Sequence, residues 1–600
     1  MTLPTTRIDV LIIGAGPVGL LTAYQLALSG CSVCIIDKDA SKSSTTSSYP
    51  TSSSQSSTFS TGRANVLYPR SAELLDQLHL LHDLLQQCHV CRESYTYDAQ
   101  GDRVIPGRVW NFVEGVEDSR VGFAVMLRQG FIEDAFKRRL EEAGVRVLGG
   151  VECMRFGVER GVAGEDEVVC VLRECGGGEE VTVKSKYLVG ADGGKSFVRR
   201  HLDVPFDGDT TQDKWIRIDG KVKTDLPTPR AYASIESPTH GNVLWAPLDR
   251  GVTRIGYVYT PEQEARHGQT LTKEAVVEEA IAAVKPFKVE FESVEWWTLY
   301  VIGQRVAATY QPHPRILLVG DACHTHSSGA AQGLNTGIHD STNLAWKLAL
   351  VLRGLAKPEL LATYNTERRA AAQRLIAFDK RISTLMAGKW PAGEEPRDPQ
   401  NEKKEINAVL ADAFDDARGF NTGLRIGYGE NVINSLLPRL GNERVCAVRP
   451  GERAPDVPLL RPGTLEKVWL QALTPNRACL YVAAFLGDPR VSLAGITSFA
   501  GFLGTSVFFR RASEKAVVNL LAIAAVGNTF LGVQDALEGQ MPFAATYYDP
   551  KRGAHHRYGV DLRYGALVVL RPDGYVGCVA DLSADGGRAV EEYLGGFLIV

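Results

Sequence analysis

A glycine-rich turn near the N-terminus has the spacing of a loop that binds nucleotide phosphates. Gly14-Ala15-Gly16-Pro17-Val18-Gly19 follows an apolar run over Ile8–Ile13, and a helical pattern continues to Ser29. Glycines in such a turn permit a tight bend, close approach of a pyrophosphate to the backbone, and packing of the helix on the strand. A second apolar run over Val33–Ile36 ends at Asp37, an acid placed to accept hydrogen bonds from an adenosine ribose. The segment therefore predicts a dinucleotide-binding strand–helix–strand unit.

Two later segments each end an apolar strand in an acid beside small residues. They are Tyr187–Arg200 (YLVGADGGKSFVRR) and Arg315–Asn335 (RILLVGDACHTHSSGAAQGLN). In the second, Asp321 is placed to accept hydrogen bonds from ribityl hydroxyls. The turn Gly333-Leu334-Asn335 precedes a helix, whose N-terminal amides and dipole can stabilise negative charge on a reduced flavin ring. The three segments in this order predict that the bound dinucleotide is FAD.

Hydrophobic periodicity predicts the elements that must position these segments. Asp340 is expected to cap a helix that passes Trp346 and ends at Gly354. From about Pro205 to Tyr300 the alternation of apolar and polar residues predicts an antiparallel sheet. A helix is expected over Leu127–Gly144, and strands over Val181–Gly190, Thr253–Tyr259 and Ile316–Val319.

Length and composition exclude several classes of function. The chain has 600 residues, of which 44% are apolar, with a net charge of −4 and a pI near 6.3. This size predicts about two to four domains. The charge gives no reason to expect nucleic acid or an anionic membrane as a partner, and no apolar run reaches the roughly 18 residues of a membrane span. Because the N-terminus also lacks the pattern of a secretion signal, we expect a cytoplasmic protein.

Three polar segments interrupt the pattern of elements. Ser41–Thr61 is dominated by Ser and Thr and is expected to be a mobile surface insertion, because it cannot bury enough apolar surface. Pro391–Glu405 is rich in Pro and charge. Pro450–Pro458 (PGERAPDVP) is typical of a linker that opens a separate C-terminal α/β domain.

Eleven cysteines raise the question of metal sites and disulfides. Cys31 and Cys34 form a CxxC pair at the start of an apolar strand, where positions i and i+3 point to opposite faces. Cys88 and Cys91 follow a helical run without Gly or Pro. We therefore expect thiols and no metal at either pair. An odd number of cysteines in a chain without a secretion signal also argues against a disulfide framework.

The three motifs resemble those of the class A flavoprotein monooxygenases, in the branch that includes the fungal phenol hydroxylases. The resemblance covers about residues 7–385, and Gly451–Val600 resembles the thioredoxin-like C-terminal domain of that branch. Further matches are Gly62-Arg63-Ala64-Asn65, Gln129 and Trp296–Arg305 (WWTLYVIGQR).

The resemblance implies an α/β fold with a Rossmann-like FAD-binding domain, an inserted antiparallel β-sheet substrate domain and a C-terminal thioredoxin-like domain. The implied boundaries are 1–205 and 305–390 for the FAD-binding domain, with the insertion at 41–61, then 206–304 for the substrate domain, 391–450 for a helical and linker region, and 451–600 for the C-terminal domain. Beyond residue 400 only Cys446, Cys479 and Cys578 occur, without CxxC, so thioredoxin redox chemistry is not expected there. A homodimer is the candidate assembly.

The resemblance also assigns roles in cofactor binding. Gly14–Gly19 with Asp37 would hold the ADP half of FAD, Arg63 and Gln129 would line the flavin path, and Asp192 would serve the FAD and NAD(P)H region. His324 and His326 are placed near the flavin and not on a metal. The full set implied to bind the cofactor is Gly14, Gly16, Pro17, Val18, Gly19, Asp37, Lys38, Gly62, Arg63, Ala64, Gln129, Asp192, Gly193, Asp321, Ala331, Gln332, Gly333, Leu334 and Asn335.

The implied reaction is oxygen insertion into an electron-rich ring, with NAD(P)H and dioxygen as co-substrates and the hard chemistry carried by the flavin. The sequence departs from the phenol hydroxylases where a phenol would be ionised. Asn65 stands in place of an acid and cannot act as a base. The Pro-Arg-Glu strand start appears as Pro247-Leu248-Asp249, the tyrosine expected two residues after Arg254 is Gly256, and a proline after the third motif's histidines is Ser328. A larger aromatic, such as a polyketide or a prenylated phenol, is therefore expected in place of phenol.

Three residues are candidates for catalysis. Asn65 matches the position of the family's acid, and Arg254 would stabilise a phenolate, although a structural role is equally open. Tyr257 would orient a substrate hydroxyl, but packing is the more frequent role of a tyrosine in a sheet. Trp296 and Trp297 are expected in the core.

Other functions on this scaffold stay open at this point. Epoxidation, Baeyer–Villiger oxidation and decarboxylative hydroxylation would use the same residues. A flavin halogenase is disfavoured, since that group carries WxWxIP where this chain has Trp296-Trp297-Thr298-Leu299. A non-catalytic protein with a degenerate flavin fold is disfavoured by the intact glycines and acids of all three motifs.

Overall fold

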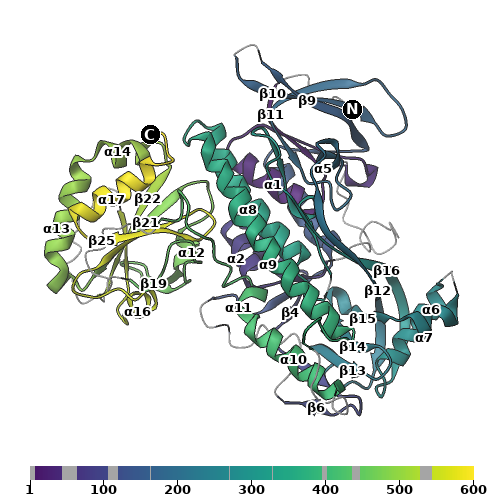
Figure 1. Cartoon of the computed structure of the whole chain (residues 1–600). Coiled ribbons are helices and arrows are strands. Elements are labelled where there is room, and N and C mark those ends of the chain that lie inside the picture. The colour runs from purple at the N-terminus through teal and green to yellow at the C-terminus, as the bar shows by residue number, and fades with distance from the viewer. Residues whose placement is uncertain are drawn as a thin grey trace.

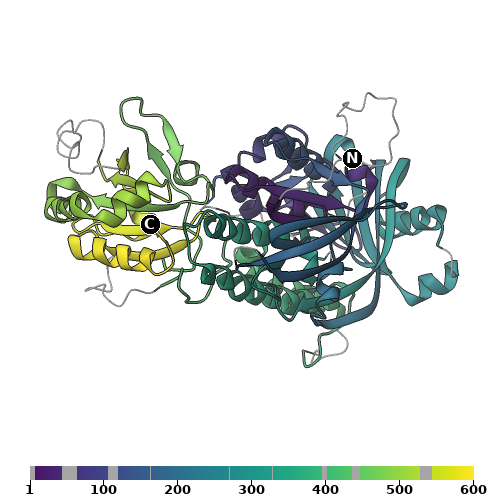
Figure 2. The same cartoon turned by 90° about the horizontal axis from the view of Figure 1, so that it is seen from above.

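The computed structural model describes residues 7–43, 64–105, 116, 119–161, 164–268, 271–327, 329–394, 402–435, 446–526 and 544–600. Figures 1 and 2 show a large N-terminal body and, at one end of it, a separate C-terminal domain. The Ser/Thr-rich stretch lies outside the described residues beyond Ser43.

The first sheet of the large body carries the dinucleotide-binding unit. Its strand order is β8-β2-β1-β11-β10-β9, with β17 paired to β11. β1 is parallel to β2 and β11, as the strand–helix–strand prediction requires. Helix α1 connects β1 to β2 and packs against α8 and α4. The bounds are β1 Ile8–Ile13, α1 Pro17–Leu28, β2 Val33–Asp37, α4 Gln129–Glu142, β8 Val147–Gly149, β9 Val151–Arg160, β10 Asp166–Glu174, β11 Val181–Gly190, α5 Phe197–His201, β17 Ile316–Leu318 and α8 Gly333–Leu352.

The second sheet is largely antiparallel and has the order β18-β16-β12-β15-β14-β13-β5-β6. Helix α7 contacts β12, β15 and β16 and covers one face, while the other face meets α9 and α10 in a second apolar cluster. The bounds are β5 Ser94–Tyr97, β6 Arg103–Val104, β12 Phe206–Thr224, β13 Tyr232–Ser237, β14 Gly241–Pro247, β15 Thr253–Tyr259, α6 Pro261–His267, α7 Lys273–Ala283, β16 Val289–Ala307, β18 His324–Thr325, α9 Ala362–Met386 and α10 Glu402–Asp416.

A three-stranded sheet, β3-β7-β4, joins these two parts. Its strands are β3 Val66–Leu67, β4 His89–Cys91 and β7 Ala124–Met126, and the neighbouring helices are α2 Pro69–Gln77, α3 Leu81–Leu85 and α11 Arg418–Asn421.

The C-terminal domain has the thioredoxin-like arrangement that the sequence predicts. Its sheet order is β20-β19-β23-β22-β21-β24-β25, with β21 parallel to β22, β24 antiparallel to β21, and β25 antiparallel to β24. The bounds are β19 Pro458–Leu460, β20 Lys467–Trp469, α12 Leu470–Leu473, β21 Leu480–Gly487, α13 Pro489–Thr505, α14 Val507–Glu514, β22 Val518–Ala524, β23 Ala544–Tyr548, α16 Gly553–Tyr558, β24 Ala566–Leu570, β25 Val576–Asp581 and α17 Ala584–Gly595.

No single helix among the described residues is long and apolar enough to cross a membrane. The bent pair α13–α14, with 72° between its helices, passes a test of length and composition. Phe499 and Leu503 of α13 and Phe509 of α14 are buried in the apolar core of the chain.

The prediction that Asp340 caps a helix is wrong. α8 begins at Gly333, so Asp340 lies well inside it and is fully buried. Its carboxylate accepts hydrogen bonds from His324 Nε2 at 2.7 Å and Arg368 Nε at 2.7 Å. An aspartate among apolar helical residues resembles an N-cap in the sequence. Here the Asp340 carboxylate instead pairs with Arg368, a buried arginine of α9.

A buried ionic network joins the two bodies. Glu367 of α9 accepts Arg571 Nη1 at 2.6 Å and Nη2 at 3.0 Å from the C-terminal domain, and Lys347 Nζ of α8 at 2.8 Å. Arg571 also pairs with Asp573 at 2.6 Å, and all four side chains are at most 3% exposed. The contacts of this carboxylate with Arg571 therefore form only when the two bodies are docked.

Pro450–Pro458 is held at this junction and is not a free linker. Arg453 Nε donates to Glu73 of α2 at 2.8 Å, and both side chains are buried. Ala454 N donates to Gly574 O at 3.0 Å, so the segment is fixed to the C-terminal domain as well.

Most cysteines are buried thiols. Burial raises the pKa of Cys31 to about 11 and that of Cys34 to about 12, and it raises the pKa of Cys323 and Cys578 well above the usual range. Burial also raises the pKa of Cys479. Among the residues with described positions, no group of three or more His, Cys, Asp or Glu side chains could hold a metal ion.

We predict that Arg571→Met lowers the stability of the protein by about 3–5 kcal/mol, because Glu367 and Asp573 then stay buried without their guanidinium. Denaturant unfolding followed by circular dichroism measures the change. Arg563→Met is the matched control, since Arg563 forms a solvent-exposed pair with Asp561 in the same domain; it should leave the midpoint unchanged. Equal midpoints for the two variants would contradict the role of the network.

Candidate functional site

The three glycines of the first motif have different surroundings. Gly14 has a φ of +106°, and a Cβ there would overlap the Ala191 carbonyl oxygen. A Cβ on Gly19 would overlap the Gly14 carbonyl oxygen. Gly16, in contrast, has no heavy atom within 4 Å of the position of a Cβ. Gly14 and Gly19 are therefore required by the fold, whereas the space beside Gly16 is open to a phosphate group.

Asp37 and the glycine loop lie together. The Asp37 carboxylate accepts a hydrogen bond from Ala15 N at 2.7 Å across the ends of β1 and β2. Pro17 occupies the first turn of α1, and Lys38 is exposed beside Asp37. The helix N-terminus and the half-buried carboxylate thus face one place, as adenosine and pyrophosphate recognition requires.

The third motif packs directly on the first. Gly320 has a φ of +64°, and its Cβ position lies 3.1–3.3 Å from Val18. This close approach puts the exposed Asp321 next to the start of α1. The carboxylate of Asp321 is therefore available to a ribityl chain that extends from the pyrophosphate.

The first backbone amides of α8 do not take part in the hydrogen bonds of the helix. Ala331 has a φ of +52°, and Gln332 caps the helix without a side-chain hydrogen bond to it. The first amide that bonds back along the helix is Thr336, at 2.8 Å from Gln332 O. The amides of Gly333, Leu334 and Asn335 precede that bond, so the positive end of the helix dipole is directed at this point.

Asn335 and Tyr68 fix the second chain segment of the site against α8. Asn335 Oδ1 accepts Tyr68 N at 2.9 Å, and its Nδ2 donates to Val66 O at 3.0 Å. Tyr68 Oη donates to Ala330 O at 2.9 Å. Because β3 is held on both sides, Asn65, which immediately precedes it, is placed beside the third motif.

Asn65 is buried and its side chain is unsatisfied by the described residues. It is 7% exposed, and its Nδ2 has no hydrogen-bond partner among them. Its backbone oxygen accepts Leu127 N at 2.9 Å, and Gln129 N donates to Ala64 O at 3.0 Å. A buried amide without a partner is uncommon in a folded protein and indicates a place where a bound molecule completes the contacts.

Asp192 of the second motif has both a structural contact and a spare oxygen. Its Oδ2 accepts Phe197 N at 2.6 Å and Val198 N at 3.1 Å, which caps α5. Oδ1 is buried without a partner in the described part of the chain, and burial raises the pKa of the carboxyl. Gly193, at a φ of +79°, follows with open space at its Cβ position.

The two sheet candidates, Arg254 and Tyr257, lie on opposite faces. Arg254 faces the second apolar cluster, where Nε and Nη2 bind Asp219 at 2.7 and 2.8 Å, and its guanidinium lies 5.0 Å from the Trp296 ring. Tyr257 packs under α7, where Oη donates to Val276 O at 2.9 Å. The structure does not bring Tyr257 to the face that carries Arg254, and its contacts are those of a packing residue.

Two buried carboxylates accept hydrogen bonds from residues of the third motif. Asp340 binds His324, and Asp379 of α9 accepts Ser327 N at 2.7 Å, Ser327 Oγ at 2.6 Å and Gln304 Nε2 at 2.7 Å. His326 lies beside the start of α8, with its Nε2 3.8 Å from the Cβ position of Gly333. Ser328, Gly62 and Arg63 lie outside the described residues.

Three buried charged residues near the candidate site belong to none of the motifs. Arg128 donates to Asp249 through Nε at 3.1 Å and Nη2 at 2.6 Å, which ties the start of α4 to the sheet. Arg217 and Asp219 of β12 lie on the same face as Arg254. The available signal was the alternation Trp215, Arg217, Asp219 in a strand, which places an aromatic and two charges on one face.

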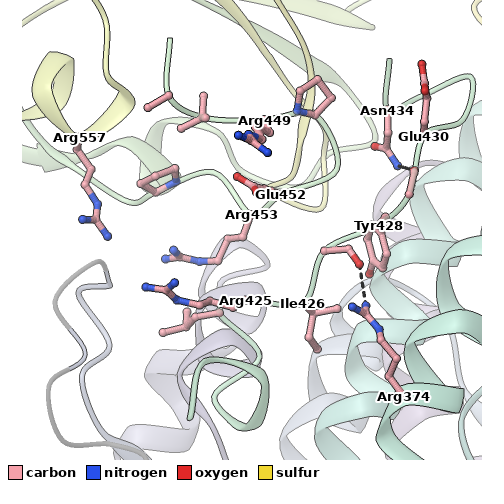
Figure 3. A pocket seen from close by; sticks show the side chains of 17 residues that line it. Arg374, Arg425, Ile426, Tyr428, Glu430, Asn434, Arg449, Glu452, Arg453 and Arg557 are labelled. Carbon is pink, nitrogen blue, oxygen red and sulfur yellow. Dashed lines mark hydrogen bonds between the residues drawn. The ribbon is translucent and has the colours of Figure 1, made fainter. Parts of the chain in front are cut away.

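A cleft of about 650 Å³ lies at the junction of the two bodies and is separate from the candidate FAD site (Figure 3). Arg425 from the large body and Arg453 and Arg557 from the C-terminal domain converge on one side of it. None of the residues that the sequence assigns to FAD or substrate lines this cleft.

The geometry fits FAD. Open space at Gly16, the paired Asp37 and Ala15, the exposed Asp321 and the free amides at the start of α8 are groups of the kinds that would hold a pyrophosphate, a ribose, a ribityl chain and a flavin ring.

Comparison with known proteins also indicates an FAD-binding protein. Residues 7–379 match the FAD binding domain family, and residues 426–600 match the phenol hydroxylase C-terminal dimerisation domain. The chain is 28% identical to phenol 2-monooxygenase fsqG of Aspergillus fumigatus, over 97% of this chain and 95% of that protein. It is 30% identical to an FAD-dependent monooxygenase of Aspergillus terreus, over 96% of this chain and 83% of that protein.

Solved structures give the same fold. Aklavinone-11 hydroxylase in a ternary complex with FAD and aklavinone superimposes with a TM-score of 0.70, at 22% identity and with 99% of each chain covered.

We predict that Gly16→Ala abolishes FAD retention without loss of apoprotein stability, because the methyl group enters the open space that the pyrophosphate would use. Gly157→Ala in β9 is the matched control, since its Cβ position is also free of neighbours within 4 Å. Flavin absorbance after gel filtration and the apoprotein melting temperature are the two measurements. Normal flavin content in Gly16→Ala would contradict this placement of the pyrophosphate.

We predict that Asp321→Ala weakens FAD binding by about 1.5–3 kcal/mol, the range for a hydrogen bond to a charged group. Titration of apoprotein with FAD, followed by quenching of flavin fluorescence, gives the two dissociation constants. Asp166→Ala, an exposed acid on β10, should leave the constant unchanged. An unchanged constant for Asp321→Ala would mean that the ribityl chain lies elsewhere.

Proposed function

The chain belongs to the FAD binding domain family and is an FAD-dependent monooxygenase, and we propose that it uses NAD(P)H and dioxygen to hydroxylate an electron-rich aromatic substrate larger than phenol, of the polyketide type. The proposal is supported by the packing of the second and third motifs on the first, at Gly14 against Ala191 and at Gly320 against Val18. It is also supported by the buried Asn65 amide nitrogen, which has no partner among the described residues.

Different residues of the chain would bind the cofactor and the substrate. When bound, FAD takes electrons from NAD(P)H and activates dioxygen for transfer of one oxygen atom. The loop Gly14–Gly19 and Asp37 would hold the ADP half, Asp321 the ribityl chain, and the amides of Gly333–Asn335 the flavin ring. The amides at the start of α8 stabilise negative charge there through the helix dipole.

Asn65 would orient the substrate. Its amide can donate to or accept from a substrate hydroxyl, but it cannot remove the hydroxyl proton. The apolar cluster formed by Val66, Trp215, Tyr232 and Met386, among others, excludes water from this side of the site. The substrate would then be ionised through its own low pKa or through Arg254, since Tyr257 lies on the opposite face of the sheet.

A substrate larger than phenol is supported by the departures at Asn65, Asp249 and Gly256, and by the solved relative that binds aklavinone. Epoxidation, Baeyer–Villiger oxidation and decarboxylative hydroxylation are the alternatives on the same scaffold. Mass spectrometry of products formed from a panel of phenolic polyketides under ¹⁸O₂ distinguishes them. Absence of ¹⁸O from every product would contradict monooxygenation of this panel.

The match of residues 426–600 to a dimerisation domain supports a homodimer, which sedimentation equilibrium would test. We also propose a cytoplasmic location.

We predict that Asn65→Ala lowers the product formed per NAD(P)H consumed and releases more hydrogen peroxide, while FAD stays bound, because the substrate hydroxyl loses its orienting group. Asn65→Asp should raise turnover of weakly acidic phenols, because a base becomes available. Product, peroxide and NAD(P)H are measured across a range of pH. Asn519→Ala in the C-terminal domain is the control. Unchanged coupling in Asn65→Ala would remove this residue from the active site.

A further inference from the structure

The cleft at the junction of the two bodies carries an excess of positive charge. Its volume of about 650 Å³ is within the range of sites that bind small molecules. Five arginines and two glutamates line it, although the whole chain has a net charge of −4. The arginines are Arg374, Arg425, Arg449, Arg453 and Arg557. Like charges gathered in a concave surface concentrate the electrostatic potential, so the cleft attracts anions.

Two of these arginines are available to a ligand. Arg425 and Arg449 are exposed, and within the part of the chain that the structure describes their guanidinium groups form no hydrogen bond, ion pair or ring contact. Arg453, in contrast, is buried and bound to Glu73. Arg425 and Arg449 therefore present charged hydrogen-bond donors to the cleft, whereas Arg453 forms part of its wall.

The backbone around Arg425 is fixed on both sides. Arg425 N donates to Gly419 O at 2.9 Å, and a Cβ on Gly419 would overlap the aliphatic carbons of the Arg425 side chain. The next residue, Ile426, is buried. Arg374 Nη2 donates to Gly427 O at 2.7 Å (Figure 3). Contacts with the backbone therefore position the stem of Arg425, while its guanidinium lines the cleft.

The wall that comes from the C-terminal domain is fixed in a similar way. Ala447 N donates to Tyr558 O at 2.8 Å, and Tyr558 Oη donates to Pro455 O at 2.9 Å. These bonds join the segment that carries Arg449 to α16, which carries Arg557. Docking of the two bodies therefore brings the arginines of both walls to one cleft (Figure 3).

The cleft also borders the buried ionic network of the junction. Tyr428 and Asn434 line the cleft. Tyr428 Oη accepts a hydrogen bond from Arg368 Nη1 at 2.9 Å, and Asn434 Nδ2 donates to Glu367 Oε1 at 2.7 Å. A ligand bound between the two walls would favour the docked arrangement, because binding to one state shifts the equilibrium toward that state.

Phosphate is the anionic group that suits arginines from several segments best. Guanidinium groups bind phosphate and carboxylate oxygens through two parallel hydrogen bonds. A carboxylate offers its two oxygens in one plane, whereas a phosphate offers oxygens in several directions. Two linked phosphate groups would also match the two available guanidinium groups.

We propose that the junction cleft binds a small molecule with a pyrophosphate group, which Arg425 and Arg449 hold between the two bodies. The cleft is separate from the candidate FAD site, so the proposal does not depend on the proposed function. Inorganic pyrophosphate and a nucleoside diphosphate both carry this group, and the experiment distinguishes them.

The test uses the FAD-loaded full chain, so that the dinucleotide site is occupied. Isothermal titration calorimetry with inorganic pyrophosphate, ADP and citrate gives the dissociation constants, at constant ionic strength because salt screens exposed charges. Citrate is the control anion, since it has several carboxylates and no phosphate. Pyrophosphate or ADP is expected to bind at least tenfold more tightly than citrate, a difference of about 1.4 kcal/mol, and to raise the melting temperature. Tighter binding of ADP assigns a nucleotide, and tighter binding of pyrophosphate assigns the inorganic ion.

Arg425→Met and Arg449→Met should each weaken binding of the tighter ligand by about tenfold and reduce its effect on the melting temperature. Gly419→Ala provides a second route, because its methyl group must displace the stem of Arg425 while the charge remains. Arg155→Met, at an exposed position of β9 outside the cleft, is the control and should bind like the wild type. Flavin absorbance confirms that every variant is folded and loaded.

Three results would overturn the proposal. If citrate binds as tightly as pyrophosphate and ADP, the cleft does not select phosphate. If neither phosphate compound binds, or both bind equally well to the wild type, Arg425→Met and Arg449→Met, the cleft is not their site. If Arg425→Met changes the sedimentation of the protein but not the binding of these ligands, the cleft is a contact between two copies of the chain.

Discussion

The buried carboxylate of Glu367 is the constraint on which the arrangement of the molecule depends. A charge removed from water must be matched by partners of good geometry. Glu367 finds its partners on α8 through Lys347 and on the C-terminal domain through Arg571. The next residue, Arg368, turns to Asp340, which in turn holds His324 of the third motif. Two consecutive residues of α9 thus connect the domain junction to the cofactor motif.

The same electrostatics keep two of the buried carboxylates ionised well below neutral pH. Arg368 and His324 counteract the desolvation of Asp340 and hold the pKa of that carboxyl at about 2, and Arg453 and Arg70 do the same for Glu73, also at about 2. A carboxyl whose folded pKa is depressed contributes stability above its ordinary pKa and loses it only as pH falls toward the folded value. The contacts that support the third motif and the junction therefore persist into acidic conditions.

Much of the fold could be predicted from the sequence, because its signals are local. The glycines of the first motif, the acid at Asp37 and the strands expected over Val181–Gly190 and Ile316–Val319 were each recognised from a few neighbouring residues. Contacts between distant segments could not be predicted. Asp340 resembles a helix cap in the sequence, because its pairing with Arg368 of α9 is visible only in the structure. Tyr257 and Gly256 are adjacent in the sequence, but adjacent residues of a strand point to opposite faces of the sheet. The structure was needed to show that Gly256, and not Tyr257, lies on the face that carries Arg254. The filling of the space at Gly256 by Arg217 required the register of β12 against β15.

The burial of the thiols has a chemical consequence for an oxygenase. Any turnover that fails to transfer its oxygen atom to substrate exposes the protein to peroxide, and peroxide attacks cysteine as the thiolate. Cys323 lies within the third motif, two residues from Asp321, where such a by-product would be most concentrated. Because burial raises the pKa of Cys323 well above the usual range, its sulfur stays protonated at neutral pH. Burial likewise raises the pKa of Cys31 and Cys34, at the start of β2, so these thiols also stay protonated at neutral pH. The packing around the third motif thus also keeps the Cys323 thiol in its less reactive, protonated form.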